Sequence, residues 1–282
     1  HDALPICDFD GTVYLIFQPA EEGGGGAKAM MDDGLFERFP MDAVYALHNW
    51  PGMPVGTVAA STGPVMGSSN EFKLLLRGKG AHAAMPHLGN DPVVAAAALI
   101  QAWQSIVSRN LKPIDDSVIS VTILRAGEAS NVIPETCTLE GTVRTFTLEV
   151  LDTIEARMGE MANAIAAAYG CTAEFHFERN YPPTINHTAQ AQIVQRAAAA
   201  VLGSGQVQAQ EPTMGAEDFA YMLQAKPGCY FFLGNGEGDH RSSGHGMGPC
   251  MLHNPSYDFN DALLPIGVQI WAALVQTELP HA

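Results

Sequence analysis

The chain has 282 residues, enough for one large domain or two smaller ones with cores of their own. Hydrophobic residues make up 47% and charged residues 16%, a globular composition that excludes a disordered chain. The net charge of −16 supplies no basic stripe for phosphates, so we expect no nucleic-acid partner. We also expect no membrane partner, because no apolar run reaches the length of a membrane helix and no signal peptide is visible.

The five cysteines are odd in number, scattered and never paired as C-x-x-C (Cys7, Cys137, Cys171, Cys229 and Cys250). This usage predicts reduced thiols and a cytoplasmic protein. The chain opens at His1 without Met and within a few residues reaches an apolar run typical of a central strand. A sheet that begins at its middle predicts an incomplete chain.

That apolar run, residues 12–17 (TVYLIF), predicts a buried strand. Residues 18–23 follow it as QPAEEG and place Glu21 beside Glu22 ahead of a glycine tract. Adjacent carboxylates repel each other unless a cation or solvent compensates, and their side chains diverge. One could therefore hold a metal while the other handles a proton. On these residues alone, a solvated acidic loop is the simpler interpretation, because short motifs often match by chance.

Residues 27–33 predict a short helix, and residues 42–49 and 56–62 predict two more strands. Strands that alternate with helices indicate an α/β sheet, in which functional groups gather at the carboxyl ends of strands. The Glu pair and His48 both stand at such ends. Their placement favours a functional role for each.

The pattern changes at residue 71. Two helices are expected at residues 91–110, with Asp91 as N-cap and Pro92 at the first position, and at residues 148–169. Four strands are expected at residues 71–77, 117–124, 137–146 and 172–178. The resulting order β-α-β-β-α-β is a split βαβ, ferredoxin-like unit that forms a complete small domain.

We therefore predict an α/β chain with two domains. Residues 1–64 and 180–282 form a discontinuous domain, and residues 65–179 form a domain inserted into it. The final stretch predicts helices at residues 188–202, 214–224 and 262–279 and a strand at residues 229–233. Glu217 and Asp218 fall on the second of these helices, where an exposed face and a supporting role at a site are equally good interpretations.

Carboxylate and imidazole groups are the ligands expected for zinc, manganese or cobalt, and the Glu pair, His48 and His253 come from three separate loops. Each histidine taken singly is more often a surface residue. In residues 77–87 (RGKGAHAAMPH), His82 could donate to an oxyanion or a substrate carbonyl, or could simply occupy a turn. For Asn131 the same two interpretations are open, a contact with substrate or a position in a turn. Arg144 has the fork that a substrate carboxylate prefers, although most arginines are merely solvated.

Seven motifs occur in order at natural spacing: QPAEEG, ALHNWPGMPVG, RGKGAHAAMPH, NVIPE, GTVRTF, MGAEDFAY and LHNPSYDFND. Together they resemble the amidohydrolase branch of the aminoacylase/carboxypeptidase metallopeptidases, which includes hippurate hydrolase, N-acyl-L-amino acid amidohydrolase and the plant auxin-conjugate hydrolases. The similarity covers about residues 8–280. It implies a metallohydrolase domain and an inserted lid that also mediates homodimerisation.

The resemblance also implies a role for each candidate. Glu21 would be the general base, and Glu22, His48 and His253 would be ligands of a site for two divalent metal ions, Mn or Zn with Co or Ni as further options. His82 and Asn131 would help bind substrate, with His82 reaching the active site of the partner subunit. The implied reaction is hydrolysis of the amide of an N-acyl amino acid, for which hippurate is the model substrate.

The chain departs from the family at one point. Members carry an upstream His-Ala-Cys-Gly-His-Asp motif that supplies two metal ligands, and Cys7 does not match it. We therefore expect a fragment with weak metal binding and little activity. A natural variant without metal is the alternative explanation of the departure. The rival functions are a non-catalytic dimerising or binding module and a dipeptidase or deacetylase of the same fold.

Overall fold

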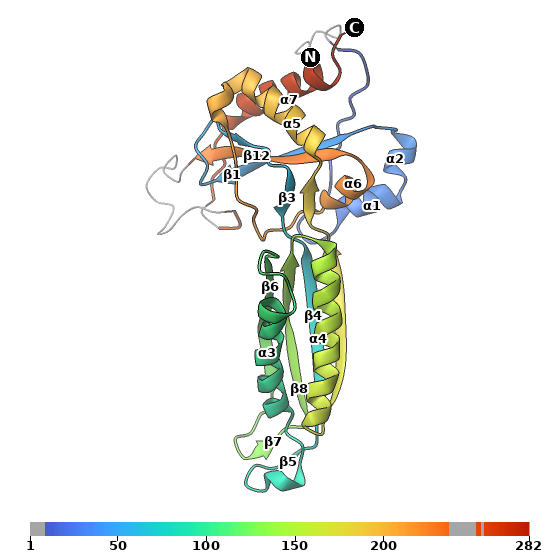
Figure 1. Cartoon of the computed structure of the whole chain (residues 1–282), viewed down its shortest axis with the longest axis vertical. Coiled ribbons are helices and arrows are strands. Elements are labelled where there is room, and N and C mark those ends of the chain that lie inside the picture. The colour runs from blue at the N-terminus through green and yellow to red at the C-terminus, as the bar shows by residue number, and fades with distance from the viewer. Residues whose placement is uncertain (1–8, 237–251, 255–256, 282) are drawn as a thin grey trace. The chain divides into compact units, whose positions relative to one another are not determined.

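The computed structural model describes residues 9–236, 252–254 and 257–281, and it divides the chain into two compact units (Figure 1). Unit 1 comprises residues 1–65, 184–212 and 218–282, and unit 2 comprises residues 66–183 and 213–217. Strand β3 (Gly63–Met66) carries the chain from unit 1 into unit 2. None of the helices in the described ranges is long and apolar enough to cross a membrane.

Unit 1 is built on a four-stranded sheet in the order β1-β12-β2-β11. Its strands are β1 (Val44–Pro51), β2 (Val58–Ala59), β11 (Val207–Gln208) and β12 (Gly228–Gly236), with β10 (Thr184–Asn186) outside this sheet. β12 runs parallel to β1 and antiparallel to β2. β12 is buried along its whole length, as expected of a strand covered on both faces.

Helices cover this sheet on both sides. The helices of unit 1 are α1 (Gly26–Asp32), α2 (Leu35–Arg38), α5 (Thr188–Leu202), α6 (Ala220–Ala225) and α7 (Leu263–Glu278), with a short 3-10 turn η2 (Ser204–Gln206). Figure 1 shows α5 and α7 side by side over one face, and α1 and α6 on the other side. Phe231 and Leu233 of β12 pack with Val194 of α5 and Ile270 of α7 in the core of the unit. This core holds in place β1, the strand that carries His48.

One expected strand of unit 1 is absent, and two other elements are shorter than expected. Residues 12–17 form no strand, and apart from half-buried Ile16 they are exposed, Leu15 by 78% and Phe17 by 87%. No strand in the described part of the chain pairs with this segment, so it has no sheet in which to bury its apolar residues. The strand at 56–62 shrinks to β2, and the helix at 214–224 shrinks to α6.

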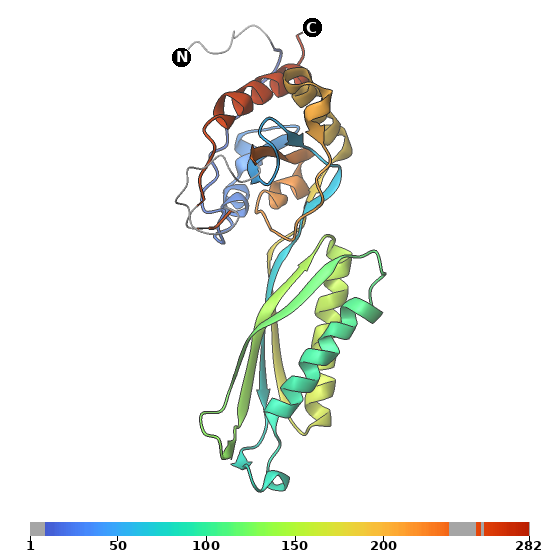
Figure 2. The same cartoon turned by 90° about the vertical axis from the view of Figure 1, so that its left-hand side faces the viewer.

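Unit 2 confirms the predicted β-α-β-β-α-β order. Its main elements are β4 (Ser69–Arg77), α3 (Pro92–Arg109), β6 (Ser117–Ala126), β8 (Thr136–Thr145), α4 (Leu148–Ala168) and β9 (Thr172–Tyr181). The antiparallel sheet has the order β6-β8-β4-β9, and both helices lie on the same face of it (Figure 2). A separate two-stranded antiparallel sheet of β5 (Ala81–His82) and β7 (Val132–Ile133), with the 3-10 turn η1 (Pro86–Leu88), extends from one end.

Local sequence explains the helix starts in unit 2. Asp91 accepts a hydrogen bond from the backbone N–H of Val93 at 2.8 Å, which caps α3, and Thr147 caps α4 in the same way through the N–H of Val150 at 3.3 Å. Alternate residues of β4 face the helices, and they pack around the fully buried Trp103. The indole N–H of Trp103 donates to the backbone oxygen of Met158 at 3.1 Å and so joins α3 to α4.

Candidate metal centre

Glu21 and Glu22 lie in a tight loop between residues 18 and 26. The backbone turns at Ala20, whose φ is 51°, and the N–H of Gly24 donates to the oxygen of Ala20 at 3.1 Å. A side chain on Gly26 would stand 1.6 Å from the backbone oxygen of Pro19. Gly26 is therefore required for the loop to fold back against Pro19 at the start of α1.

The structure brings Glu22 together with His253. Oε1 of Glu22 lies 3.7 Å from Nε2 of His253, and both side chains are open to solvent, with exposed fractions of 76% and 72%. Two ligand atoms that each sit about 2.1 Å from one zinc ion lie at most about 4.2 Å apart. The observed separation is therefore compatible with two ligands of a single ion.

The backbone is strained at two points of this region. Within the described part of the chain, Ala20 (φ 51°) and His253 (φ 64°) are the non-glycine residues with positive φ. This left-handed conformation costs a residue with a side chain about 1–2 kcal/mol. Such residues cluster at functional sites, where the surrounding structure holds them in place. The strain falls on His253 itself and on the residue before Glu21.

His48 stands on β1 with a defined proton position. Its Nδ1 lies 2.5 Å from the backbone oxygen of Asn49, and a carbonyl oxygen can only accept, so Nδ1 carries the hydrogen. The lone pair of Nε2 is therefore available for a metal. Ligating histidines commonly donate their other ring N–H to a backbone carbonyl in this manner. The rings of Trp50 and Tyr230 flank His48, with centroids at 6.2 and 6.3 Å.

Hydrogen bonds anchor the two histidine motifs to each other. The hydroxyl of Tyr257 donates to Oδ1 of Asn49, which follows His48 in β1. The backbone N–H of Tyr257 donates to the oxygen of Asn254 at 2.8 Å, and Asn254 follows His253. Buried Asn235 of β12 holds the same segment by donating to the oxygen of Asp258 and accepting the N–H of Asn260. These contacts give Tyr257, Asp258 and Asn260, which follow His253 in the motif, a structural role.

His48 itself does not join Glu22 and His253 in one compact set. Within the described residues, no group of three His, Cys, Asp or Glu ligand atoms lying within 4.8 Å of one another includes His48, Glu22 or His253. A carboxylate oxygen of Asp218 does lie within 4.8 Å of one from Glu21. Asp218 is fully buried, and its neighbour Glu217 is 6% exposed, so the interpretation as an exposed face is wrong.

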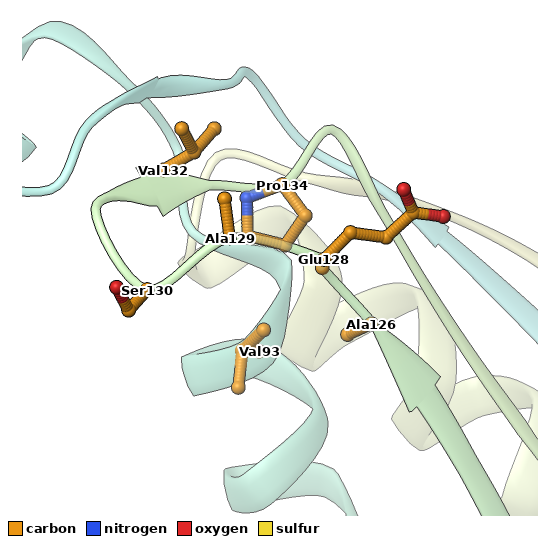
Figure 3. A pocket seen from close by; sticks show the side chains of 8 residues that line it. Val93, Ala126, Glu128, Ala129, Ser130, Val132 and Pro134 are labelled. Carbon is orange, nitrogen blue, oxygen red and sulfur yellow. The ribbon is translucent and has the colours of Figure 1, made fainter.

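In unit 2 the structure brings His82 and Asn131 together at the two-stranded sheet of β5 and β7. His82 of β5 pairs with Val132 of β7, and the backbone oxygen of Asn131 accepts from the N–H of Ala83 at 2.9 Å. The backbone N–H of Ala84 donates to Nδ1 of His82 at 3.1 Å, so the neutral ring carries its hydrogen on Nε2. A shallow depression lined by Val93 of α3 and by residues 126–130, 132 and 134 lies beside this small sheet (Figure 3).

Arg144 lies in the four-stranded sheet of unit 2, at the end far from β5 and β7. It stands near the end of β8, where its guanidinium donates to the backbone oxygen of Ser68 at 3.5 Å, and burial lowers its pKa. Thr136, at the start of β8, pairs with Arg77, the last residue of β4 before β5. Eight residue steps at about 3.3 Å separate the two ends by roughly 26 Å. One subunit therefore cannot bring Arg144 and His82 to the same small substrate within unit 2.

The donor set of unit 1 suits a divalent transition metal. Glu22 offers a carboxylate oxygen, and His48 offers the lone pair of Nε2. Imidazole and carboxylate ligands together match zinc, manganese and cobalt. The anchored backbone around both histidines would fix these ligands before an ion arrives.

Comparison with known proteins identifies the family of the chain. Residues 6–277 match the model of the peptidase family M20/M25/M40. The chain belongs to this family. It is 42% identical over 230 residues to an N-acetyl-L-cysteine deacetylase of Bacillus subtilis (strain 168), a match that covers 82% of this chain and 54% of that protein.

Two further relatives extend the comparison. The chain is 34% identical over 271 residues to IAA-amino acid hydrolase ILR1-like 4 of Arabidopsis thaliana, covering 95% of this chain and 60% of that protein. It superposes with a TM-score of 0.76 and 31% identity on the YXEP protein of Bacillus subtilis, described as a dinuclear metal binding peptidase from the M20 family. That match covers 93% of this chain and 64% of the other. The chain thus spans less than two thirds of the length of each of these relatives.

Proposed function

We propose that the protein is a metal-dependent amidohydrolase that cleaves the amide of N-acyl amino acids. The observation that carries the proposal is the contact between Glu22 and His253 beside Glu21, at the strained backbone positions of unit 1. Family membership supports the reaction class, because the relatives are named as deacetylases and as an amino acid hydrolase.

We propose two divalent ions, Mn or Zn with Co or Ni as alternatives, held in part by Glu22, His48 and His253. When bound, such ions supply an acidified water and a polarised acyl carbonyl. The dinuclear description of the YXEP protein supports the number. The open Nε2 of His48 and the proximity of Glu22 to His253 support these three residues as ligands.

Glu21 is the proposed general base. Its carboxylate takes a proton from water as the water oxygen bonds to the acyl carbon, and it then gives that proton to the amide nitrogen as the C–N bond breaks. The products are a carboxylate and a free amino acid. The contact of Glu22 with His253 supports Glu22 as a metal ligand, and the motif resemblance assigns the proton transfer to Glu21.

His82, Asn131 and Arg144 are the proposed substrate contacts from unit 2. Nε2–H of His82 is a donor that suits a substrate oxygen, and Arg144 offers a fork for the carboxylate of the amino acid. Since His82 lies beyond one end of the four-stranded sheet and Arg144 lies near its other end, we propose that His82 serves the active site of a partner subunit. Residues 65–179 would then be the lid and dimerisation domain, and residues 1–64 and 180–282 the catalytic domain.

A homodimer through unit 2 has one further support. Strand β6 is a ten-residue edge strand of the four-stranded sheet in the described part of the chain. Long edge strands tend to be covered, because their unpaired backbone groups recruit other strands. We also propose a cytoplasmic location, supported by the free, buried thiols of Cys137, Cys171 and Cys229. Cys7 and Cys250 lie outside the described residues.

The acyl group distinguishes the two candidate substrate classes. Hippurate-like substrates follow from the motif resemblance, whereas the bacterial relative is named for an N-acetyl substrate. We therefore propose N-acyl amino acids as the class, with acetyl and benzoyl groups to be compared directly. A dipeptidase of the same fold is the alternative within the enzymes.

The test is hydrolysis of N-acetyl amino acids, hippurate and dipeptides by the complete gene product with added manganese or zinc. We expect turnover of acyl amino acids that is lost on chelation and restored by the metal. A dimer that binds no metal and hydrolyses none of these substrates would instead support a non-catalytic binding module.

A further inference from the structure

Asp218 joins the two ends of the loop that carries the Glu pair. Its Oδ1 accepts from the side-chain amide of Gln18, and its Oδ2 accepts from the backbone N–H of Ala27 at 2.8 Å. Gln18 is the residue at which the chain enters the loop, and Ala27 lies in the first turn of α1, where the loop ends. Glu21 and Glu22 stand between these two anchor points.

The environment of Asp218 makes both contacts strong. The residue is 0% exposed, and a buried carboxylate is costly unless hydrogen bonds satisfy it. Hydrogen bonds to an ionised acceptor are roughly twice as strong as neutral ones. Helix α1 has no side-chain cap of its own, so Asp218 supplies a side-chain partner for its first turn from a distant part of the chain.

The loop between the anchor points needs this support. Ala20 is held in the left-handed region, and Gly26 lies against the backbone of Pro19 without room for a side chain. Strained backbone persists only where surrounding contacts over-determine it. The carboxylate of Asp218 also lies within 4.8 Å of that of Glu21, so the anchor adjoins the proposed general base.

We propose that Asp218 is a positioning residue, which fixes Glu21 for proton transfer by tethering Gln18 and Ala27. It acts through the loop and does not itself contact the reacting atoms. The inference rests on the proposed function for the role of Glu21, whereas the tether itself is a statement about the loop.

The first test uses matched variants. Gln18→Met removes the amide that Asp218 binds at little change in size. Gln195→Met is the control, because Gln195 in the same unit is also half-buried and donates one hydrogen bond, to the oxygen of Ala60 at 2.7 Å. We expect Gln18→Met to lower kcat about tenfold to a hundredfold, as displaced catalytic groups do. Its KM and melting temperature should match those of Gln195→Met.

Hydrogen exchange supplies a readout that does not depend on activity. Backbone amides of residues 20–27 should exchange faster in Gln18→Met than in the parent protein, and at the parent rate in Gln195→Met. Equal exchange in this loop for both variants would overturn the tether. An active parent enzyme whose kcat falls equally in both variants would overturn the positioning role.

A reciprocal exchange provides the rescue. In Gln18→Glu/Asp218→Asn the new amide donates to the new carboxylate while its oxygen still accepts from Ala27, so both contacts return at unchanged net charge. We expect the double variant to recover most of the kcat and loop protection lost in Gln18→Glu alone. Failure to recover either would overturn the proposal. A parent protein that hydrolyses no acyl amino acid would defeat the proposed function, and the exchange data would still decide the tether.

Discussion

Two histidines of this chain are prepared for opposite tasks by their nearest backbone neighbours. His48 donates through Nδ1 to a carbonyl and presents a lone pair at Nε2, whereas His82 accepts at Nδ1 from an N–H and presents a hydrogen at Nε2. The first state suits a metal ligand and the second suits a donor to substrate. Sequence could nominate both residues, but it could not assign these proton positions, because each depends on local backbone geometry.

Glutamine substitutions test these assignments. A glutamine amide can donate near the position of Nε2 but is a poor metal ligand. His82→Gln should therefore retain about tenfold more kcat than His82→Ala, since an oxyanion donor is worth roughly a hundredfold or more. His48→Gln should instead lose bound metal, measured by elemental analysis. Equal activities for His82→Gln and His82→Ala would contradict the donor role.

Cys229 predicts a loss of stability at alkaline pH. Burial raises the pKa of this thiol to about 12 from its ordinary value of 9.0. The folded state therefore disfavours the thiolate, so the stabilisation is complete below pH 9 and declines by at most about 1.4 kcal/mol per pH unit as pH rises toward 12. Burial and its hydrogen bond to Glu278 raise the pKa of Tyr45 in the same sense.

The measurement is the free energy of unfolding of unit 1 between pH 8 and pH 11. Cys229→Ala should have a shallower decline than the parent protein, at the expense of a small cavity. An unchanged slope in Cys229→Ala would show that this thiol does not titrate on unfolding in that range.

At the scale of elements, unit 2 was predictable and parts of unit 1 were not. Asp91-Pro92 and Thr147 mark helix starts through local contacts, and alternating strands reveal a sheet with one covered face. The apolar run at 12–17 has the same local signal, but a strand needs a pairing partner, which short-range sequence does not reveal. The left-handed backbone conformation at His253 could not be predicted either, because the residue there is not the glycine that usually marks it.

Trp103 tests how α3 and α4 are held together. Trp103→Phe removes the hydrogen bond to the oxygen of Met158 and leaves that oxygen without this donor in the core. We expect the unfolding free energy of unit 2 to fall by about 1–3 kcal/mol. Denaturant unfolding followed by circular dichroism checks this value. A change below about 0.5 kcal/mol, the usual range for surface substitutions, would contradict it.

At the scale of the whole molecule, the distance between His82 and Arg144, which is at least about the length of β8, predicts complementation between subunits. If His82 serves the partner's site and Arg144 serves its own, mixing His82→Ala with Arg144→Ala creates hybrid dimers with one intact site. Random exchange should restore about a quarter of parental activity, because half of the dimers are hybrids and each has one of two sites intact. No recovery after verified subunit exchange would mean that both residues serve one site.

The loop with Glu21 and Glu22 carries the central claim, that one glutamate moves protons and its neighbour holds metal. Their sequence pattern suggested a division of labour, and the contact of Glu22 with His253 supports the assignment. The most direct measurement is turnover and metal content of Glu21→Gln beside Glu22→Gln in the complete gene product. We predict that Glu21→Gln retains metal while kcat falls at least about a hundredfold, and that Glu22→Gln loses metal. Loss of metal from Glu21→Gln, or full activity in it, would contradict the account.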